Sequence, residues 1–338
     1  MAVALVAPLV GCSAGSSPAA APPGRSTAAT DSGSAAPTAT RTASTGTPPR
    51  VVAGRVATLP SGLSRTVAVR RGGAVVLLGG LGPGDVTTGR IWRLDVSSRR
   101  TTTVGSLAEA VHDASGAVLG GQVVVFGGGA ATEVADAQAW TSGPARVVGR
   151  LPDGRSDSAA AVVDGTAYVV GGYNGSAITR DIAATRSGRT FRVAGRLHRG
   201  VRYPAVTAFE GAVWVVGGDL ATTTGTAGGA QTAAIQRFDT ASGRTTVVGR
   251  LPHPLGHAMA FTLGGRLFVA GGRSGAGATD AVWSIDPADG SVHRAGRLPQ
   301  PLSDAAVVGV GHSVWLVGGE RTGPLAPLRS VVRVGLAP

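Results

Sequence analysis

The sequence predicts an all-β fold, a six-bladed β-propeller of four-stranded antiparallel blades, from three repeated features. Six Gly-Gly doublets follow apolar runs, and their first glycines are 48, 44, 46, 54 and 47 residues apart. A leucine stands 20 residues before each doublet, and a hairpin-turn glycine lies between leucine and doublet in five units. The doublets begin at Gly79, Gly127, Gly171, Gly217, Gly271 and Gly318. The leucines are Leu59, Leu107, Leu151, Leu197, Leu251 and Leu298.

One repeat unit shows how the strands are expected to follow one another. Residues 158–163 are small and apolar, Asp164-Gly165 is a hairpin-turn pair, and residues 166–170 form a second apolar run. A third strand after the doublet is clearest at residues 280–286, and a turn at 287–290 leads to a fourth strand that ends near the next leucine. Four antiparallel strands in about 48 residues match one propeller blade.

The two ends of the repeat region predict how the ring closes. Residues 298–338 supply only three strands of the last blade, the third over residues 328–336. Residues 51–59 lack preceding strands but end in the first repeat leucine. We therefore expect them to form the outermost strand of the last blade, which would pair an otherwise open edge.

The amino-terminal residues resemble a secretion signal followed by a flexible linker. Residues 1–11 are apolar, too few for a membrane-spanning helix, and have the character of a signal-peptide core. Residues 9–12, Leu-Val-Gly-Cys, resemble the lipobox of bacterial lipoproteins, although no basic residue precedes them. The resemblance implies a lipidated Cys12, which would anchor the protein to the outer side of the cell membrane.

Residues 12–50 are almost entirely Ala, Ser, Thr, Pro and Gly, a composition typical of a disordered linker. The alternative is an apolar start that happens to contain one cysteine.

Composition limits the classes of function. The single Cys excludes a disulfide scaffold and a cysteine-based zinc site. The formal net charge is +12, and every basic residue is Arg. This excess fits either a bias in coding composition or affinity for anionic lipid headgroups or cell-wall polymers. Nucleic acid is not an expected partner for a secreted protein.

The repeat resembles the kelch family. Kelch blades carry the Gly-Gly doublet with an aromatic residue three positions earlier, and four units here hold Tyr168, Trp214, Phe268 and Trp315 there. Arg155 also falls where kelch repeats often place an arginine. The resemblance implies a divergent kelch-type propeller over residues 51–338, within the galactose-oxidase-like superfamily. The copper-radical chemistry of some relatives needs a Cys near a Tyr in the propeller, and here the only Cys is in the linker. Such a fold does not by itself specify a function.

Polar residues recur where each innermost strand begins, six positions after the repeat leucines. They are Arg65, Asp113, Asp157, Tyr203, His257 and Asp304. We expect them to ring the channel mouth on the face that carries the loops between strands two and three and between strands four and one. Further candidate ligand-binding residues nearby are Tyr173, Arg155, Arg273 and Glu320. His112, Arg202, Asp219 and His253 also lie nearby. The alternative is structural, since such residues also satisfy channel water and backbone groups. No metal or cofactor is expected.

The leading functional hypothesis is a non-catalytic, monomeric binding propeller that recognises a protein or cell-envelope ligand on this face. The alternative is a glycosidase-like, carbohydrate-active enzyme that uses channel-mouth carboxylates. It would need two carboxyl groups about 5–9.5 Å apart, with Asp113 and Asp157 as the first pair to consider. A third possibility is a structural partner in an envelope complex, which would bind through the outer surface of a blade.

Overall fold

The computed structural model describes residues 48–221, 230–275, 277–321 and 326–338. The expected signal peptide, Cys12 and nearly all of the linker therefore lie outside the described residues. The described residues form strands, turns and bridges without an α-helix, so they include no helix long and apolar enough to span a membrane.

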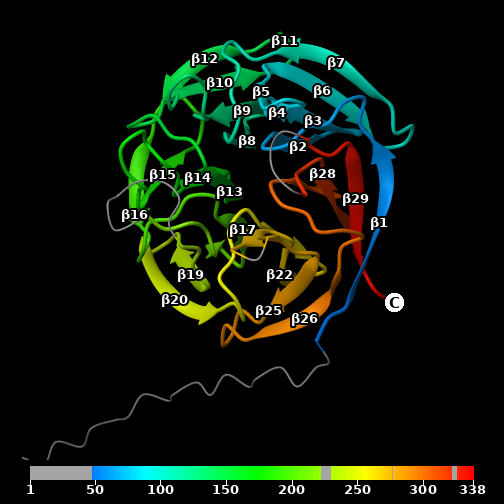
Figure 1. Cartoon of the computed structure of the whole chain (residues 1–338). Helices are drawn as coiled ribbons and strands as arrows, with labels where there is room; N and C mark the ends of the chain where they lie inside the picture. The colour runs from blue at the N-terminus through cyan, green and yellow to red at the C-terminus, as the bar shows by residue number, and fades with distance from the viewer. Residues whose placement is uncertain (1–47, 222–229, 276, 322–325) are drawn as a thin grey trace, which may run out of the picture. The chain divides into compact units, whose positions relative to one another are not determined.

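Six antiparallel sheets form the blades of a β-propeller around a central channel, as the sequence predicts (Figure 1). From the channel outward, blade 1 contains β2 (Val67–Arg71), β3 (Ala74–Leu78), β6 (Arg90–Asp95) and β7 (Thr101–Ser106). Blade 2 contains β8 (Ser115–Leu119), β9 (Gln122–Phe126), β10 (Asp136–Trp140) and β12 (Arg146–Arg150). Blade 3 contains β13 (Ala159–Val163), β14 (Thr166–Val170), β15 (Asp181–Thr185) and β16 (Arg192–Arg196).

The remaining blades repeat this order. Blade 4 contains β17 (Ala205–Phe209), β18 (Ala212–Val216), β19 (Ala234–Asp239) and β20 (Arg244–Arg250). Blade 5 contains β21 (Met259–Leu263), β22 (Arg266–Ala270), β25 (Ala281–Ile285) and β26 (Val292–Arg297). Blade 6 contains β27 (Ala306–Val310), β28 (Ser313–Val317), β29 (Ser330–Leu336) and β1 (Val51–Thr58).

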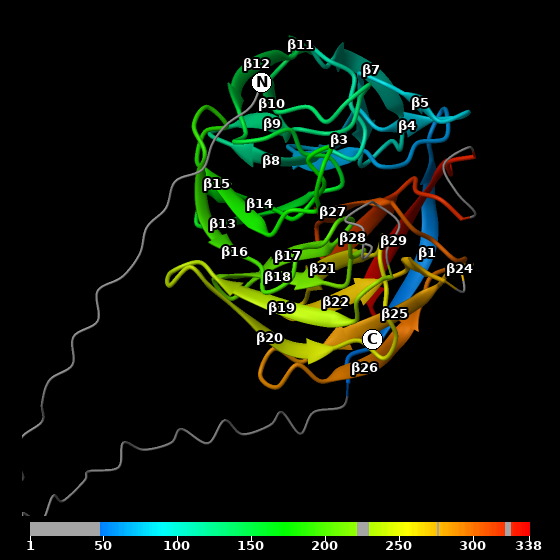
Figure 2. The ribbon, with the colours of Figure 1, turned by 60° about the vertical axis from the view of Figure 1, so that its left-hand side comes forward.

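Blade 6 joins the two ends of the repeat region, so the predicted closure is confirmed. Strand β1 pairs antiparallel with β29, from Val51 opposite Leu336 to Thr58 opposite Ser330. Figures 1 and 2 both show the two strands side by side. The amino-terminal strand therefore covers the edge that β29 would otherwise expose.

Short pairings add to this regular pattern. Strand β11 (Gly143–Pro144) runs parallel to β7 and makes the sheet of blade 1 five-stranded, where the sequence predicted four strands. The contact requires Gly105 in β7, because a Cβ there would lie 2.0 Å from the Gly143 carbonyl oxygen. Two small hairpins lie beyond the doublets of blades 1 and 5. They are β4 (Leu81–Gly82) with β5 (Val86–Thr87), and β23 (Arg273–Ser274) with β24 (Gly277–Ala278).

The hydrophobic core is divided into six clusters, each between two adjacent blades. Four doublets are preceded by an aromatic residue, and these side chains pack toward the next blade, as Tyr168 does against blade 4, Trp214 against blade 5 and Trp315 against blade 1. The ring is therefore stabilised mainly by burial of apolar surface between blades.

The Gly-Gly doublets dock each blade onto the next. The first glycine of every doublet has φ between 58° and 66°, and the second between 93° and 115°. A Cβ on the first glycine would lie 1.9–2.4 Å from a carbonyl oxygen of the following blade. The N–H of the second glycine donates to that same oxygen, as in Gly128 to Arg155 at 2.8 Å. Glycine is required here by backbone conformation and by close approach together.

Candidate functional site

Six residues, one from each blade, form a ring where the innermost strands begin. This channel ring consists of Arg65, Asp113, Asp157, Tyr203, His257 and Asp304. All six have left-handed backbone conformations, with φ between 50° and 57°. Each N–H donates to the carbonyl oxygen of the ring residue in the preceding blade at 2.8–3.1 Å, and Arg65 donates to Asp304. The six bonds form a closed loop, so the residues are neighbours in space although successive ring residues are 44 to 54 positions apart in sequence, and Arg65 and Asp304 are 239 apart.

A second set of contacts fixes the ring to the loops above it. In every blade, the residue before the ring residue forms a β-bridge with the residue after the doublet. Arg202 pairs in this way with Asp219, and Ser303 with Glu320. The residues that follow the doublets are therefore held next to the ring through their backbone.

Arg65 connects opposite sides of the ring. Its Nη1 donates to Asp113 Oδ2 at 3.0 Å and to the Tyr203 hydroxyl at 3.2 Å, and its Nε donates to Glu320 Oε1 at 2.8 Å. The side chain of Arg65 is 12% exposed and that of Glu320 is fully buried. Because each bond joins charged or polar groups from different blades, Arg65 fixes the relative positions of blades 1, 2, 4 and 6.

His257 lies between two carboxylates. Its Nδ1 is 2.7 Å from Asp304 Oδ1 and its Nε2 is 3.4 Å from Asp219 Oδ2. The imidazole stacks on Tyr203 with ring centroids 3.8 Å apart. Arg273 then donates from Nη2 to Asp304 at 2.6 Å and to Glu320 at 3.1 Å.

Arg202 occupies the other side of the ring, between two tyrosines. Its Nη2 is 2.5 Å from Asp157 Oδ2. Its guanidinium carbon lies 4.7 Å from the Tyr203 ring centroid and 5.3 Å from that of Tyr173. Tyr173 is half-buried, and its hydroxyl donates to the Gly175 carbonyl at 2.7 Å. These contacts extend the cluster from the ring to the loop of blade 3.

Burial and charge shift the pKa values of the ring in opposite directions. Burial raises the pKa of Asp113 to about 8, against the attraction of Arg65. Burial would also raise the pKa of Asp304, but His257, Arg273 and Arg65 together hold it well below its ordinary range. Burial would lower the pKa of His257, yet Asp304 and Asp219 raise it to about 9. These shifts favour the protonated form of Asp113, the ionised form of Asp304 and the cationic form of His257.

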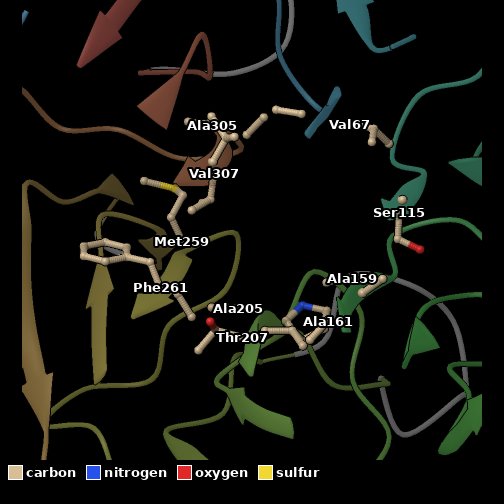
Figure 3. Close-up of a pocket in the computed structure, with 18 of the residues that line it drawn as sticks. Val67, Ser115, Ala159, Ala161, Ala205, Thr207, Met259, Phe261, Ala305 and Val307 are labelled. Carbon is tan, nitrogen blue, oxygen red and sulfur yellow. The ribbon is translucent and has the colours of Figure 1, made fainter. Parts of the chain in front are cut away.

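A cavity of about 490 Å³ fills the channel below the ring. The inner strands of all six blades line it with mostly small or apolar side chains, including Ala161, Thr207 and Val307 (Figure 3). The side chains of the ring aspartates are 3–6% exposed, whereas Val162, at the hairpin-turn end of the cavity, is 39% exposed. The ring thus nearly closes the channel at the loop face.

The structure brings nine of the ten predicted site residues into one cluster, namely the six ring residues with Tyr173, Arg273 and Glu320. Arg155 lies apart: it is 1% exposed, donates to Asp153 and to the Asp181 carbonyl, and is a packing residue of blade 3. Arg202 and Asp219 belong to the cluster but were not among the predicted site residues. Their signal was positional, since one precedes a ring residue and the other follows a doublet. Among the described residues, no three His, Cys, Asp or Glu side chains are arranged to hold a metal ion.

Comparisons with known proteins agree with this architecture. The family model described as the kelch motif matches residues 154–182. No curated protein matches the chain. The solved structure of YjhT superposes with a TM-score of 0.69 at 15% sequence identity, covering 84% of this chain and 99% of that one. Such a likeness shows the fold. The chain is a six-bladed β-propeller whose third blade contains a match to the kelch motif.

Proposed function

We propose that this chain is a non-catalytic binding propeller that recognises a protein or cell-envelope ligand on the face over the channel ring. The observation that carries the proposal is the charged cluster to which all six blades contribute. Because its backbone is held in a closed loop of hydrogen bonds, its donors and acceptors are positioned before any ligand arrives. Such preorganisation lowers the entropic cost of binding.

The state of the carboxylates supports binding over catalysis. Asp113, Asp157 and Asp304 each contact an arginine within 3.0 Å, and Glu320 contacts two within 3.1 Å. A general acid or base must be free to reach its substrate. On the loop side, Tyr173 is half-buried and the Arg273 side chain is 25% exposed, so these residues are the accessible part of the cluster.

The location of the propeller is part of the same proposal. A lipidated Cys12 followed by the linker over residues 12–50 would display the propeller outside the cell membrane, and the propeller would act as a monomer. The sequence of residues 9–12 supports this step. Replacement of Cys12 with Ser should release the protein from the membrane fraction in a detergent-partition assay.

Photo-crosslinking in the native envelope tests the binding face. A photoreactive phenylalanine analogue is placed at Tyr173 on the loop face and, as a matched control, at Val162 at the hairpin-turn end of the channel. Mass spectrometry then identifies the adducts. We expect an adduct from position 173 and none from position 162. Adducts from position 162 alone would instead place the ligand in the channel.

A glycosidase-like enzyme is the second candidate. The observation that favours it is the pair of ring carboxyl groups with opposite pKa shifts, since the pKa of Asp113 is raised and that of Asp304 is lowered. Turnover of a panel of 4-nitrophenyl glycosides that is lost in D113N would support this candidate. The binding proposal predicts no turnover by the wild-type protein.

A further inference from the structure

A basic turn lies on the perimeter of blade 3, on the face opposite the channel ring. It joins β15 to β16 and carries Arg186, Arg189 and Arg192, all exposed. The exposed Arg146 of the neighbouring strand β12 adds a fourth guanidinium group. These four arginines are called the basic ridge below.

The arginines of the basic ridge have no carboxylate partner, unlike others on the outer strands. Arg150, Arg196 and Arg297 pair with Asp136, Asp181 and Asp280 at 2.8–3.4 Å. Among the described residues, no carboxylate oxygen lies within 4.0 Å of a ridge guanidinium group. The charge of the ridge is therefore available to a partner.

The turn is fixed in position by the neighbouring blade. The Thr185 hydroxyl oxygen accepts hydrogen bonds from the N–H groups of Ser187 and Gly188 at 3.3 and 2.9 Å. A Cβ on Gly188 would lie 2.7 Å from Val124, and one on Gly149 would lie 2.3 Å from the Gly188 carbonyl oxygen. The backbone of the turn therefore packs tightly on blade 2, and its arginines project from a rigid base.

A groove lies on each side of the turn. Arg186 and Arg192 line a groove of about 520 Å³ toward blade 4, and Arg146 and Arg189 line one of about 480 Å³ toward blade 2. Hydroxyl groups line both grooves, from Thr166, Thr185, Ser187, Thr190 and Thr240 in the first and from Thr141 and Ser142 in the second. Asp164 is the one carboxylate among the residues that line the two grooves.

We propose that the basic ridge binds a linear polymer with one phosphate in each repeat, of the polyol-phosphate type. Guanidinium groups bind phosphate oxygens in a bidentate manner, and hydroxyl groups suit both phosphate and polyol oxygens. The two grooves provide a path for an extended chain across the turn. A flat anionic membrane would reach the exposed arginines but would not use the grooves.

The absence of exposed aromatic residues distinguishes this partner from a nucleic acid. Single-stranded nucleic acids bind to basic grooves whose aromatic side chains stack on the bases. The aromatic residues that line the grooves are Tyr168, which is 6% exposed, and Phe191, which packs edge-on against Phe126 with ring centroids 5.8 Å apart. The grooves therefore recognise phosphate and hydroxyl groups without a platform for bases.

Fluorescence anisotropy with the full-length protein and a labelled poly(glycerol phosphate) chain of about 20 repeats tests the proposal. The test variant is R186Q/R189Q/R192Q. The matched control, R55Q/R100Q/R266Q, removes the same charge from exposed arginines of blades 6, 1 and 5. At about 1 kcal/mol for each basic residue near an anionic surface, we expect the triple test variant to bind roughly 100- to 200-fold more weakly. The control should bind within about threefold of wild type, and R146Q alone should bind measurably more weakly.

The outcomes separate this surface from the alternatives. Binding by wild type that falls steeply with added salt, together with selective loss in the ridge variants, supports the proposal. An equal loss in the control triple variant would overturn it, because binding would then follow net charge alone. Stronger binding of phosphatidylglycerol vesicles, or of a 20-nucleotide dT strand at the same ionic strength, would also overturn it. Every variant changes exposed side chains only, and thermal unfolding verifies that each keeps the wild-type fold.

Discussion

The six residues of the channel ring have a left-handed backbone conformation, which residues other than glycine seldom adopt. Each left-handed residue of this kind costs roughly 1–2 kcal/mol. Glycine would relieve this strain, but it would remove the side chains that join the blades. Arg65 alone contacts residues of three other blades. The backbone strain at each position is therefore offset by charged contacts and by the closed loop of backbone hydrogen bonds.

Replacement of Arg65 with Met tests this balance. Asp113 would lose its arginine and Glu320 would keep only Arg273, so buried carboxyl oxygens would be left without a donor and we expect the free energy of unfolding to fall by about 1–3 kcal/mol. The matched control is Arg93 to Met, because the Arg93–Asp95 pair is solvent-exposed, with side chains 45% and 27% exposed, and such a pair contributes little to stability. Urea unfolding at pH 7 measures both. A loss below 1 kcal/mol for R65M would contradict a structural role, and the double variant R65M/E320Q should recover part of the loss.

The sequence locates the ring but not its contacts. A fixed offset from the repeat leucines was enough to identify all six positions, because each blade repeats the same path. The left-handed backbone carries no strong sequence signal when the residues are Arg, Tyr or His. The partners Arg202 and Asp219 meet only through the bridges between adjacent loops, and the burial of Arg155 depends on Asp153 and the Asp181 carbonyl.

At the level of elements, strands with a strong apolar pattern were predictable and two-residue pairings were not. The inner strands and the pairing of β1 in blade 6 follow from the repeat, since the strand positions seen in one unit apply to the other five. Strand β11 depends on Gly143 reaching Gly105 of the previous blade, a contact that neither segment signals by itself. The aromatic residues before the doublets do lie between blades, because the alternation of side chains in the second strand directs them there.

Removal of β1 tests how far the closing strand stabilises the ring. A chain that starts at residue 59 lacks the partner of β29 and the buried side chain of Val51, whereas a chain that starts at residue 48 keeps both. Because domains of this kind are stable by only about 5–15 kcal/mol, we expect the shorter chain to lose cooperative thermal unfolding and to self-associate through the open edge. Circular dichroism and light scattering compare the two chains. Equal melting temperatures and a monomeric shorter chain would show that closure is dispensable.

For the whole molecule, cohesion comes from contacts that repeat around the ring. Six apolar clusters, six bonds from the doublets and six bonds of the channel ring each join neighbouring blades. The sequence predicted the blade count because each interface needs the same doublet. It could not assign a role to the net charge of +12, since only the fold brings Arg146 beside the turn over residues 186–192 and shows which arginines lack a carboxylate partner.

The pKa values of the ring predict that the protein loses stability as the pH rises. Folding raises the pKa of His257 from 6.5 to about 9 and that of Asp113 from 3.8 to about 8. A group that binds its proton more tightly in the folded state stabilises the fold fully below its unfolded pKa and loses this contribution as the pH passes its folded pKa. Asp113 contributes to this loss from about pH 4 to pH 8 and His257 from about pH 6.5 to pH 9, so the free energy of unfolding should fall by about 5 kcal/mol between pH 6.5 and pH 9. Urea midpoints at pH 6, 7, 8 and 9 measure this slope.

H257Q should be less stable than wild type at pH 6 and have a shallower slope, and the exposed control H293Q should follow wild type. A flat wild-type profile, or an unchanged slope in H257Q, would contradict the assignment of His257 as a buried cation.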